Sequence, residues 1–263
     1  MYNDSLIRLS FFIGIFLIVA LWELIAPMRK LKISKKKRWF SNLVLVVLNT
    51  LVLRIVFPTT AVGVALLCNE YSLGLLNILD IPLWSKVTIA FLVLDFAIYT
   101  QHVLFHYLPL LWRFHKVHHV DLDYDVTTGL RFHPVEIVLS MLIKFAVICF
   151  IGAPVLAVII FEITLNGLAL FNHGNIRLFK KLDSFLRFFI VTPDVHRVHH
   201  STIPSETNSN FGFNLIFWDK ILGTYKSQPK KGHILMDIGL DQYTDSNITQ
   251  SLKNMLKIPF LRK

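Results

Sequence analysis

The stretch H-V-L-F-H-Y-L-P-L-L-W-R-F-H-K-V-H-H, residues 102–119, holds five of the chain's eleven histidines. They form one pair spaced by four residues and one H-x-x-H-H box: His102, His106, His115, His118 and His119. Residues three or four apart share a face of a helix, so we expect each box to aim its imidazoles at one point. Imidazole is a frequent metal ligand, and the spacing therefore predicts a metal site built on helices.

The box pattern returns later in the chain. D-V-H-R-V-H-H places His196, His199 and His200 in a third box, while His133 and His173 stand singly between the second and third boxes. Eight imidazoles at helical spacing favour a metal centre over unrelated surface or core histidines. His233 lies in a Lys-rich loop, where we expect an ordinary surface residue.

The composition indicates a membrane protein. The chain has 263 residues, a mean hydropathy of +0.56 and only 17% charged residues, and long uncharged runs recur along it. The net charge of +10 comes from basic residues beside apolar runs, with no nucleic-acid-binding motif, so we expect no nucleic-acid partner. Cys68 and Cys149 fall inside apolar runs without a nearby partner, which argues against a disulfide framework.

Charge sets the expected topology of the first half. Residues 6–26 form an apolar run long enough to span a bilayer, which we interpret as a retained anchor rather than a cleaved signal peptide. Seven basic residues and no acid follow between Arg29 and Arg38, so this loop is expected to be cytoplasmic. Residues 40–67, with an expected kink at Pro58, return the chain to the other side.

The second half then brings the histidines to one surface. A third span begins near Trp84 and ends in the first box, while residues 137–171 are interrupted by Gly-Ala-Pro at 152–154 and predict a membrane hairpin. All ten candidate histidines are then expected at the cytoplasmic surface. The acidic segment D-L-D-Y-D, residues 121–125, is expected to be a solvated loop that supplies no ligand.

The expected fold is all-α: a polytopic membrane helical bundle with a cytoplasmic histidine-rich cap over the transmembrane helices. We divide it into an N-terminal transmembrane region (1–84), a catalytic domain (85–226) and a basic C-terminal tail (227–263). The protein is expected in a bacterial inner membrane or a membrane of the endoplasmic-reticulum type.

The ligand set narrows the chemistry. Eight to ten histidines suffice for two metal ions with open positions, although imidazole alone allows iron, zinc, copper or nickel. The hydrolytic H-E-x-x-H motif is absent, and oxidation of an unactivated C–H bond needs a metal oxidant, which favours two irons and dioxygen. A metal-dependent membrane hydrolase or ether-lipid-cleaving enzyme stays open as an alternative, as does a metal transport or storage protein.

Further segments resemble, in order, those of the fatty acid hydroxylase and sterol desaturase superfamily between about Asp95 and Tyr225. They read R-F-H-P-V-E, F-N-H-G-N, T-P-D-V-H-R-V-H-H-S, N-S-N-F-G and W-D-K-I-L-G-T-Y. The resemblance implies a non-haem di-iron centre that uses dioxygen and two electrons to hydroxylate or desaturate a sterol, fatty acyl or related lipid. The implied ligands are His102, His106, His115, His118, His119, His173, His196, His199 and His200.

The residues leave open whether there is a tenth metal ligand and which residue it is. Fatty acid hydroxylases often carry a histidine four residues before the one that matches His173, but this chain has Ala169 there. His133 is the candidate replacement, with a structural role beside Glu136 as the alternative. Asp194 is expected to orient an imidazole of the third box, and Glu136 to support the ligands from behind.

The chain shows no Gly-rich dinucleotide fingerprint and no cytochrome segment. We therefore expect a separate electron-donor protein, either cytochrome b5-like or a ferredoxin or flavoprotein reductase. No catalytic side chain beyond the metal ligands is assigned.

Overall fold

The computed structural model describes residues 2–261, where about two thirds of the residues are helical and no β-strand occurs. The long helices are α1 (Tyr2–Ile25), α2 (Lys35–Val56), α5 (Leu83–Tyr107), α7 (Pro134–Ile151) and α8 (Val155–Asn172). The shorter ones are α3 (Ala61–Glu70), α4 (Leu75–Ile78), α6 (Pro109–His119), η1 (Thr128–Leu130), α9 (Lys180–Leu186), α10 (Pro193–His199), α11 (Pro204–Thr207), α12 (Phe217–Ile221), α13 (Gly232–Leu235), α14 (Ser246–Thr249), α15 (Leu252–Lys257) and η2 (Ile258–Phe260).

The predicted membrane bundle is confirmed. Within residues 2–261, five helical segments are long and apolar enough to cross a bilayer: Asp4–Ile25, Lys35–Ile78, Leu83–Tyr107, Pro134–Ile151 and Val155–Asn172. Their outward faces carry many exposed large hydrophobic side chains. Such faces suit hydrocarbon rather than water, because burying apolar surface away from water is what stabilises a soluble fold.

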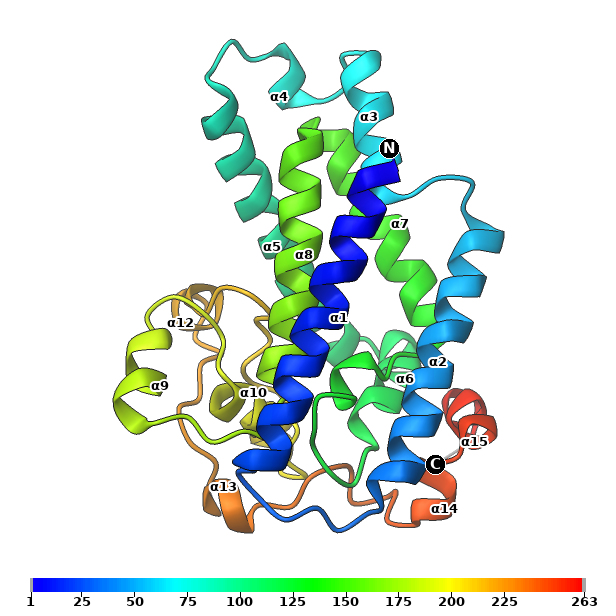
Figure 1. Ribbon diagram of the computed structural model, residues 1–263, viewed down its shortest axis with the longest axis vertical. Coiled ribbons are helices and arrows are strands. Elements are labelled where there is room, and N and C mark those ends of the chain that lie inside the picture. The colour runs from blue at the N-terminus through cyan, green and yellow to red at the C-terminus, as the bar shows by residue number, and fades with distance from the viewer. Residues whose placement is uncertain (1, 262–263) are drawn as a thin grey trace.

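The bundle has two different ends (Figure 1). The long helices run upright, with α3, α4 and the turn between α7 and α8 at the upper end of the view. The lower end holds α6, α10 and the C-terminal helices α13 to α15. Helix α8 packs against α1, α3 and α5 and so ties the bundle together. We call the lower end the histidine pole, because α6 and α10 carry the second and third boxes.

The hairpin predicted for residues 137–171 is present. Helix α7 ends at Ile151, and Gly152 reverses the chain with a φ of 65°, a left-handed conformation that a residue with a Cβ rarely adopts. The turn also packs closely on the loop before α4, where a Cβ on Gly74 would lie 2.1 Å from the Gly152 nitrogen. Both glycines are needed for this contact.

The second apolar stretch is interrupted at Pro58, where a kink was expected. Within the candidate span Lys35–Ile78, α2 ends at Val56 and α3 begins only at Ala61, so the helix is broken there rather than only kinked. Pro58 lies in the break, where its missing N–H and fixed φ stop a continuous helix. Helix α3 instead packs against α7 and α8 at the upper end of the bundle.

The two cysteines also differ from expectation. Cys68 on α3 and Cys149 on α7 were expected to have no partner, but their sulfur atoms lie 3.5 Å apart. Both thiols are free. The packing of α3 on α7 brings together residues 81 positions apart, which the sequence does not reveal.

The C-terminal region packs on the protein rather than trailing away from it. Met255 and Ile258 are buried in a cluster with Leu45 of α2 and Val117 of α6. The C-terminal region therefore packs against α6, the helix that carries the second histidine box.

Candidate metal centre

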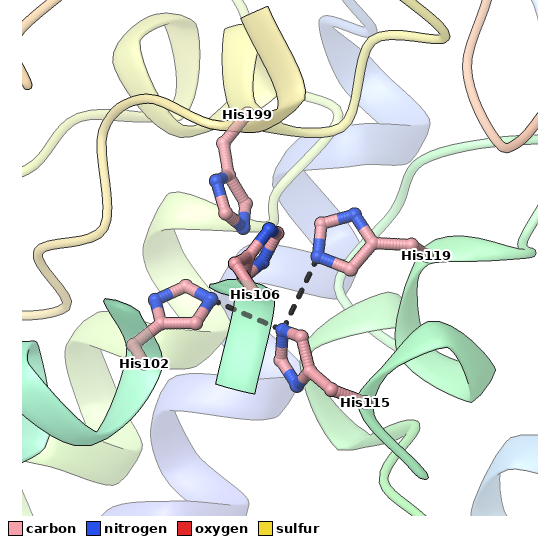
Figure 2. A group of neighbouring side chains, drawn as sticks. All are labelled: His102, His106, His115, His119 and His199. Atoms are coloured by element: carbon pink, nitrogen blue, oxygen red, sulfur yellow. Dashed lines mark hydrogen bonds between the residues drawn. The ribbon is translucent and has the colours of Figure 1, made fainter. Parts of the chain in front are cut away.

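Five histidines form a first group at the histidine pole. They come from α5, α6 and α10: His102, His106, His115, His119 and His199. One ring nitrogen from each lies within 4.8 Å of those of all the others. Figure 2 shows the five rings turned toward a common centre.

Four more histidines form a second group. His118 lies on α6, His173 follows the last residue of α8, and His196 and His200 come from α10 and its C-terminal end. Their ligand atoms also lie within 4.8 Å of one another. All nine predicted superfamily positions are thus gathered, five in one group and four in the other.

Each H-x-x-H-H box is divided between the two groups, which corrects the expectation of one point per box. His115 and His119 enter the first group and His118 enters the second, whereas His196 and His200 enter the second and His199 the first. In a helix of 3.6 residues per turn, the first and last histidines of the box, four residues apart, differ by about 40°, whereas the middle histidine points about 100° from the last. The H-x-x-H-H spacing therefore directs the histidines of one box into two separate groups.

The two groups lie side by side. The rings of His119 and His200, one from each group, are stacked with centroids 4.7 Å apart. The rings of His196 and His199, again one from each group, are stacked with centroids 5.0 Å apart. Two ions held by these groups would be neighbours.

Hydrogen bonds fix the orientation of five rings. Nδ1 of His102 donates to the Phe211 carbonyl at 2.7 Å, and Nδ1 of His199 to the Ser209 carbonyl at 2.7 Å. Nδ1 of His173 donates to the Ala169 carbonyl at 2.6 Å. The remaining two partners are side chains, Asn208 for His106 at 3.1 Å and Glu136 for His115 at 2.6 Å.

The hydrogen bonds at Nδ1 show which ring nitrogens of the first group are free to bind a cation. A carbonyl oxygen only accepts, so the protons of His102 and His173 lie on Nδ1 and each Nε2 has a free lone pair. Nε2 of His102 nevertheless faces Nε2 of His115 at 3.1 Å, although the Nδ1 of His115 donates to Glu136. Two lone pairs at this distance repel unless a cation lies between them. The separation matches two ligands held about 2.1 Å from one ion, so the residues fit a metal.

The second group also has unprotonated ring nitrogens that face one another. Nε2 of His173 faces Nε2 of His118 at 3.2 Å and Nε2 of His196 at 3.1 Å. Both ring nitrogens of His200 are buried without a hydrogen-bond partner. Buried polar atoms are rarely left unpaired, so these nitrogens also fit the role of metal ligands.

Burial keeps these imidazoles in the ligand form. It lowers the pKa of His173 to about 3, and it lowers the pKa values of His118, His196 and His200 well below the usual range. Neighbouring imidazoles add to the effect, because each would repel a second positive charge. Neutral imidazole is the form that binds metals.

His133 lies outside both groups. It precedes α7, where its Nδ1 accepts a hydrogen bond from the Val135 N–H at 3.2 Å. Its ring packs against Phe114 and Phe260. The structure thus gives His133 a helix-capping position, and the two groups contain nine histidines without it.

Glu136 and Asp194 have different surroundings. Glu136 supports His115 directly, as expected for a carboxylate behind a metal ligand. Asp194 contacts none of the grouped imidazoles through a hydrogen bond, and its carboxylate instead pairs with Arg197 at 2.5 Å. Asp194 also lies 3.7 Å from His233, which is buried rather than at the surface and whose pKa burial lowers to about 4.

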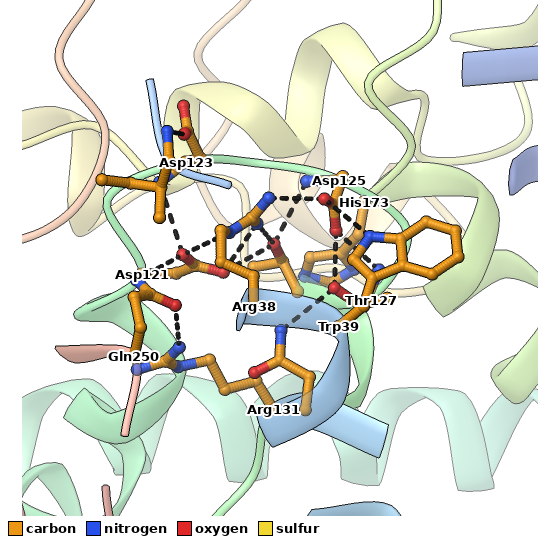
Figure 3. Close-up of polar contacts among 12 residues, drawn as sticks. Arg38, Trp39, Asp121, Asp123, Asp125, Thr127, Arg131, His173 and Gln250 are labelled. Atoms are coloured by element: carbon orange, nitrogen blue, oxygen red, sulfur yellow. Dashed lines mark hydrogen bonds and ion pairs between the residues drawn. The ribbon is translucent and has the colours of Figure 1, made fainter. Parts of the chain in front are cut away.

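The acidic segment after the second box corrects another expectation. Asp121, Asp123 and Asp125 are buried, not solvated. Arg38 at the start of α2 is fully buried among them: it contacts both carboxylate oxygens of Asp121, at 3.0 and 2.8 Å, and also pairs with Asp125 (Figure 3). Burial raises the pKa of Asp121, but Arg38 and Arg131 outweigh it and bring the value to about 2.

The N-S-N-F-G segment plays a part that sequence reasoning missed. The Asn208 side chain and the carbonyls of Ser209 and Phe211 orient three ligand rings. Asp219, from the W-D-K segment, accepts hydrogen bonds from the Phe211 and Gly212 N–H groups and holds this loop in place. A backbone carbonyl leaves no mark in a sequence, so only Asn208 could have been suspected from it.

Spans of this length that end in two polyhistidine groups define an integral membrane protein with a candidate dinuclear metal centre. The chain belongs to the fatty acid hydroxylase family, whose model matches residues 87–224. All nine grouped histidines fall inside that match.

The sequences of curated relatives align with about half of this chain or more. Ornithine lipid hydroxylase OlsE from Rhizobium tropici is 30% identical over 183 residues, which cover 69% of this chain and 52% of that protein. Alkylglycerol monooxygenase from Homo sapiens is 30% identical over 147 residues (54% of this chain, 31% of that protein), and its Xenopus tropicalis counterpart 31% over 157 (59% and 34%). The chain thus spans about half the length of the first relative and about a third of the others. No solved structure matches it.

Proposed function

We propose that this protein is a membrane-bound di-iron oxidoreductase that uses dioxygen and two electrons to hydroxylate or desaturate a lipid. The observation that carries the proposal is the presence of two adjacent histidine groups, within each of which Nε2 atoms face one another at 3.1 to 3.2 Å. The names of the relatives, a lipid hydroxylase and alkylglycerol monooxygenases, support a lipid as substrate. Two irons would supply the oxidant that an unactivated C–H bond requires.

The chain's own residues hold and tune such a pair. Nine imidazoles would hold it, five from one group and four from the other. Glu136 and the carbonyls of Phe211, Ser209 and Ala169 keep the protons of four rings on Nδ1, so that each Nε2 lone pair would be free to hold a metal ion. Phe132 stacks on His118 with 4.6 Å between ring centroids, and such apolar neighbours exclude water from the site.

The position of the centre argues against transport. Transport sites use ligands near the middle of the bilayer, whereas these histidines lie at one pole, on α6 and α10 and at the ends of α5 and α8. We propose that this pole is cytoplasmic, because the basic loop between α1 and α2 lies there as well. Electrons would then come from a separate donor protein on that side.

Oxygen consumption coupled to lipid turnover tests the function. The purified chain, reconstituted in lipid with a chemical reductant, is given ¹⁸O₂, and the lipid products are analysed by mass spectrometry. Incorporation of one ¹⁸O atom, or a new double bond formed with oxygen uptake, supports the proposal. Lipid cleavage with oxygen from water and without oxygen uptake would instead establish the hydrolase alternative.

A further inference from the structure

A cavity of about 400 Å³ lies beside the first histidine group, between α6 and the C-terminal segment. Trp112, Arg113 and Lys116 line it from α6, and Phe260 and Leu261 line it from the other side. It has no role in the arrangement of the metal ligands described above. Its volume lies in the range of small-molecule sites and is enough for a polar headgroup.

The cavity shares a wall with the candidate metal centre. The Trp112 ring lies 4.9 Å from the His106 ring and 5.4 Å from the His119 ring, measured between centroids. The indole therefore separates the cavity from the first group by the thickness of one side chain. A molecule anchored in the cavity would have the rest of its length within reach of the centre.

The charge of the lining is positive. Arg113 and Lys116 both line the cavity, and none of its described lining residues carries a carboxylate. Lys116 is buried, and its Nζ donates to the Tyr243 hydroxyl at 3.1 Å, which fixes the ammonium group in place. Arg113 is exposed and has no ion pair among residues 2–261. A guanidinium and an ammonium group together favour a phosphate or carboxylate.

The rim of the cavity is apolar. Phe260 is 68% exposed and Leu261 43% exposed, and Leu108 and Leu110 stand exposed on either side of Pro109, another lining residue. Exposed apolar residues beside a cationic cavity match an amphiphile, with the anionic group inside and the apolar part along the rim. A soluble anion would gain nothing from this rim.

We propose that this cavity binds the anionic headgroup of the lipid that the metal centre oxidises. The inference rests on the proposed oxygenase function and names its substrate class: a lipid whose headgroup carries a phosphate or carboxylate. Arg113 and Lys116 bind the headgroup, and Trp112 lies between it and the first histidine group. Arg113 and Lys116 are thus specificity-determining residues rather than catalytic ones.

Binding is measured first, independently of turnover. The full chain in detergent is titrated with phosphatidic acid and with diacylglycerol of the same acyl chains, and bound lipid is followed by native mass spectrometry. The variant is Arg113→Gln, because Arg113 is exposed and its replacement leaves the core intact. The double variant Lys180→Gln/Lys181→Gln removes exposed positive charge from α9, far from the cavity, and serves as the control.

We expect phosphatidic acid to bind at least about tenfold more tightly than diacylglycerol, and Arg113→Gln to abolish most of that preference. The α9 control keeps it. An unchanged preference in Arg113→Gln, or an equal loss in the control, would overturn the proposal. Inorganic phosphate and glycerol phosphate are added as competitors: displacement of the lipid by inorganic phosphate at equal concentration would show a site for the free anion, not for a lipid.

Turnover separates this inference from the proposed function. With an oxidisable anionic lipid, Arg113→Gln should raise KM by about tenfold and leave kcat unchanged, because Arg113 does not touch the reacting atoms. Oxygenase activity with an unchanged KM would overturn the headgroup site alone. Selective lipid binding without any oxygen uptake would overturn the oxygenase and leave the anion site established.

Discussion

Glu136 holds His115 from behind: its carboxylate oxygen Oε1 accepts a hydrogen bond from the ring Nδ1 over 2.6 Å. Both side chains are almost completely buried. His115 in turn points its Nε2 at the Nε2 atoms of both His102 and His119, at 3.1 and 3.2 Å. One carboxylate on α7 therefore orients the imidazole at the middle of the first group.

Replacing this carboxylate should weaken the metal site without unfolding the chain. Glu136→Gln removes the charge and keeps the size, so His115 loses its anionic partner. We expect metal affinity to fall by about 10- to 100-fold, measured by competition with a chelator. Glu70→Gln, at an exposed position on α3, is the matched control and should change nothing. Equal affinities for Glu136→Gln and wild type would remove Glu136 from the site.

His133 decides between nine and ten ligands. If it only caps α7, His133→Asn should retain the acceptor at the helix start and keep the wild-type metal content. His133→Ala should keep the same metal content but lose about 1 kcal/mol of stability. Both variants are checked by metal analysis and thermal unfolding. Loss of one metal ion in His133→Asn would make this residue a tenth ligand.

Arg38 should be essential for stability. It is fully buried, and its replacement leaves the carboxylates of Asp121 and Asp125 buried without a counter-charge. Breaking a buried ion pair from one side costs about 3–5 kcal/mol. Arg38→Ala should therefore unfold at a much lower denaturant concentration, while Lys36→Ala, at an exposed position on the same helix, should match the wild type. Similar stabilities for the two variants would contradict the structural role of Arg38.

Metal-free protein should be sensitive to mild acid. Burial lowers the pKa values of His118, His196 and His200 well below 6.5, so the folded state keeps them neutral while the unfolded state protonates them. Below pH 6.5 the unfolded state therefore binds more protons than the folded state. As the pH is lowered, the free energy of unfolding decreases by up to about 1.4 kcal/mol per pH unit for each such histidine. Unfolding midpoints from pH 8 to pH 5 measure this slope. A flat profile for metal-free protein would show that the rings are not held neutral.

The spans and the histidines could be predicted because their signals are local. Apolar runs of bilayer length mark α1, α5 and the α7–α8 hairpin, and the box spacing marks helical faces. The division of each box between two groups also follows from helical geometry, since residues such as His115 and His119 share a face that His118 does not.

The surroundings of the ligands could not be predicted, because they depend on distant pairings. The sequence around Asp121 is typical of a solvated loop, but the fold places Arg38 of α2, 83 residues away in the chain, against its carboxylate. Cys68 and Cys149, like the orienting carbonyl of Phe211, meet their partners only through packing of the helices. No local pattern in the sequence reports such contacts.

The metal content of the protein tests the central claim most directly. Protein purified without oxygen is analysed for metals and by Mössbauer spectroscopy, beside the variants His118→Ala and His133→Asn. We predict two irons per chain in the wild type and in His133→Asn, and a reduced iron content in His118→Ala, which removes one of the four ligands of the second group. A single tightly bound zinc, or an iron content that His118→Ala does not change, would contradict the proposed di-iron centre.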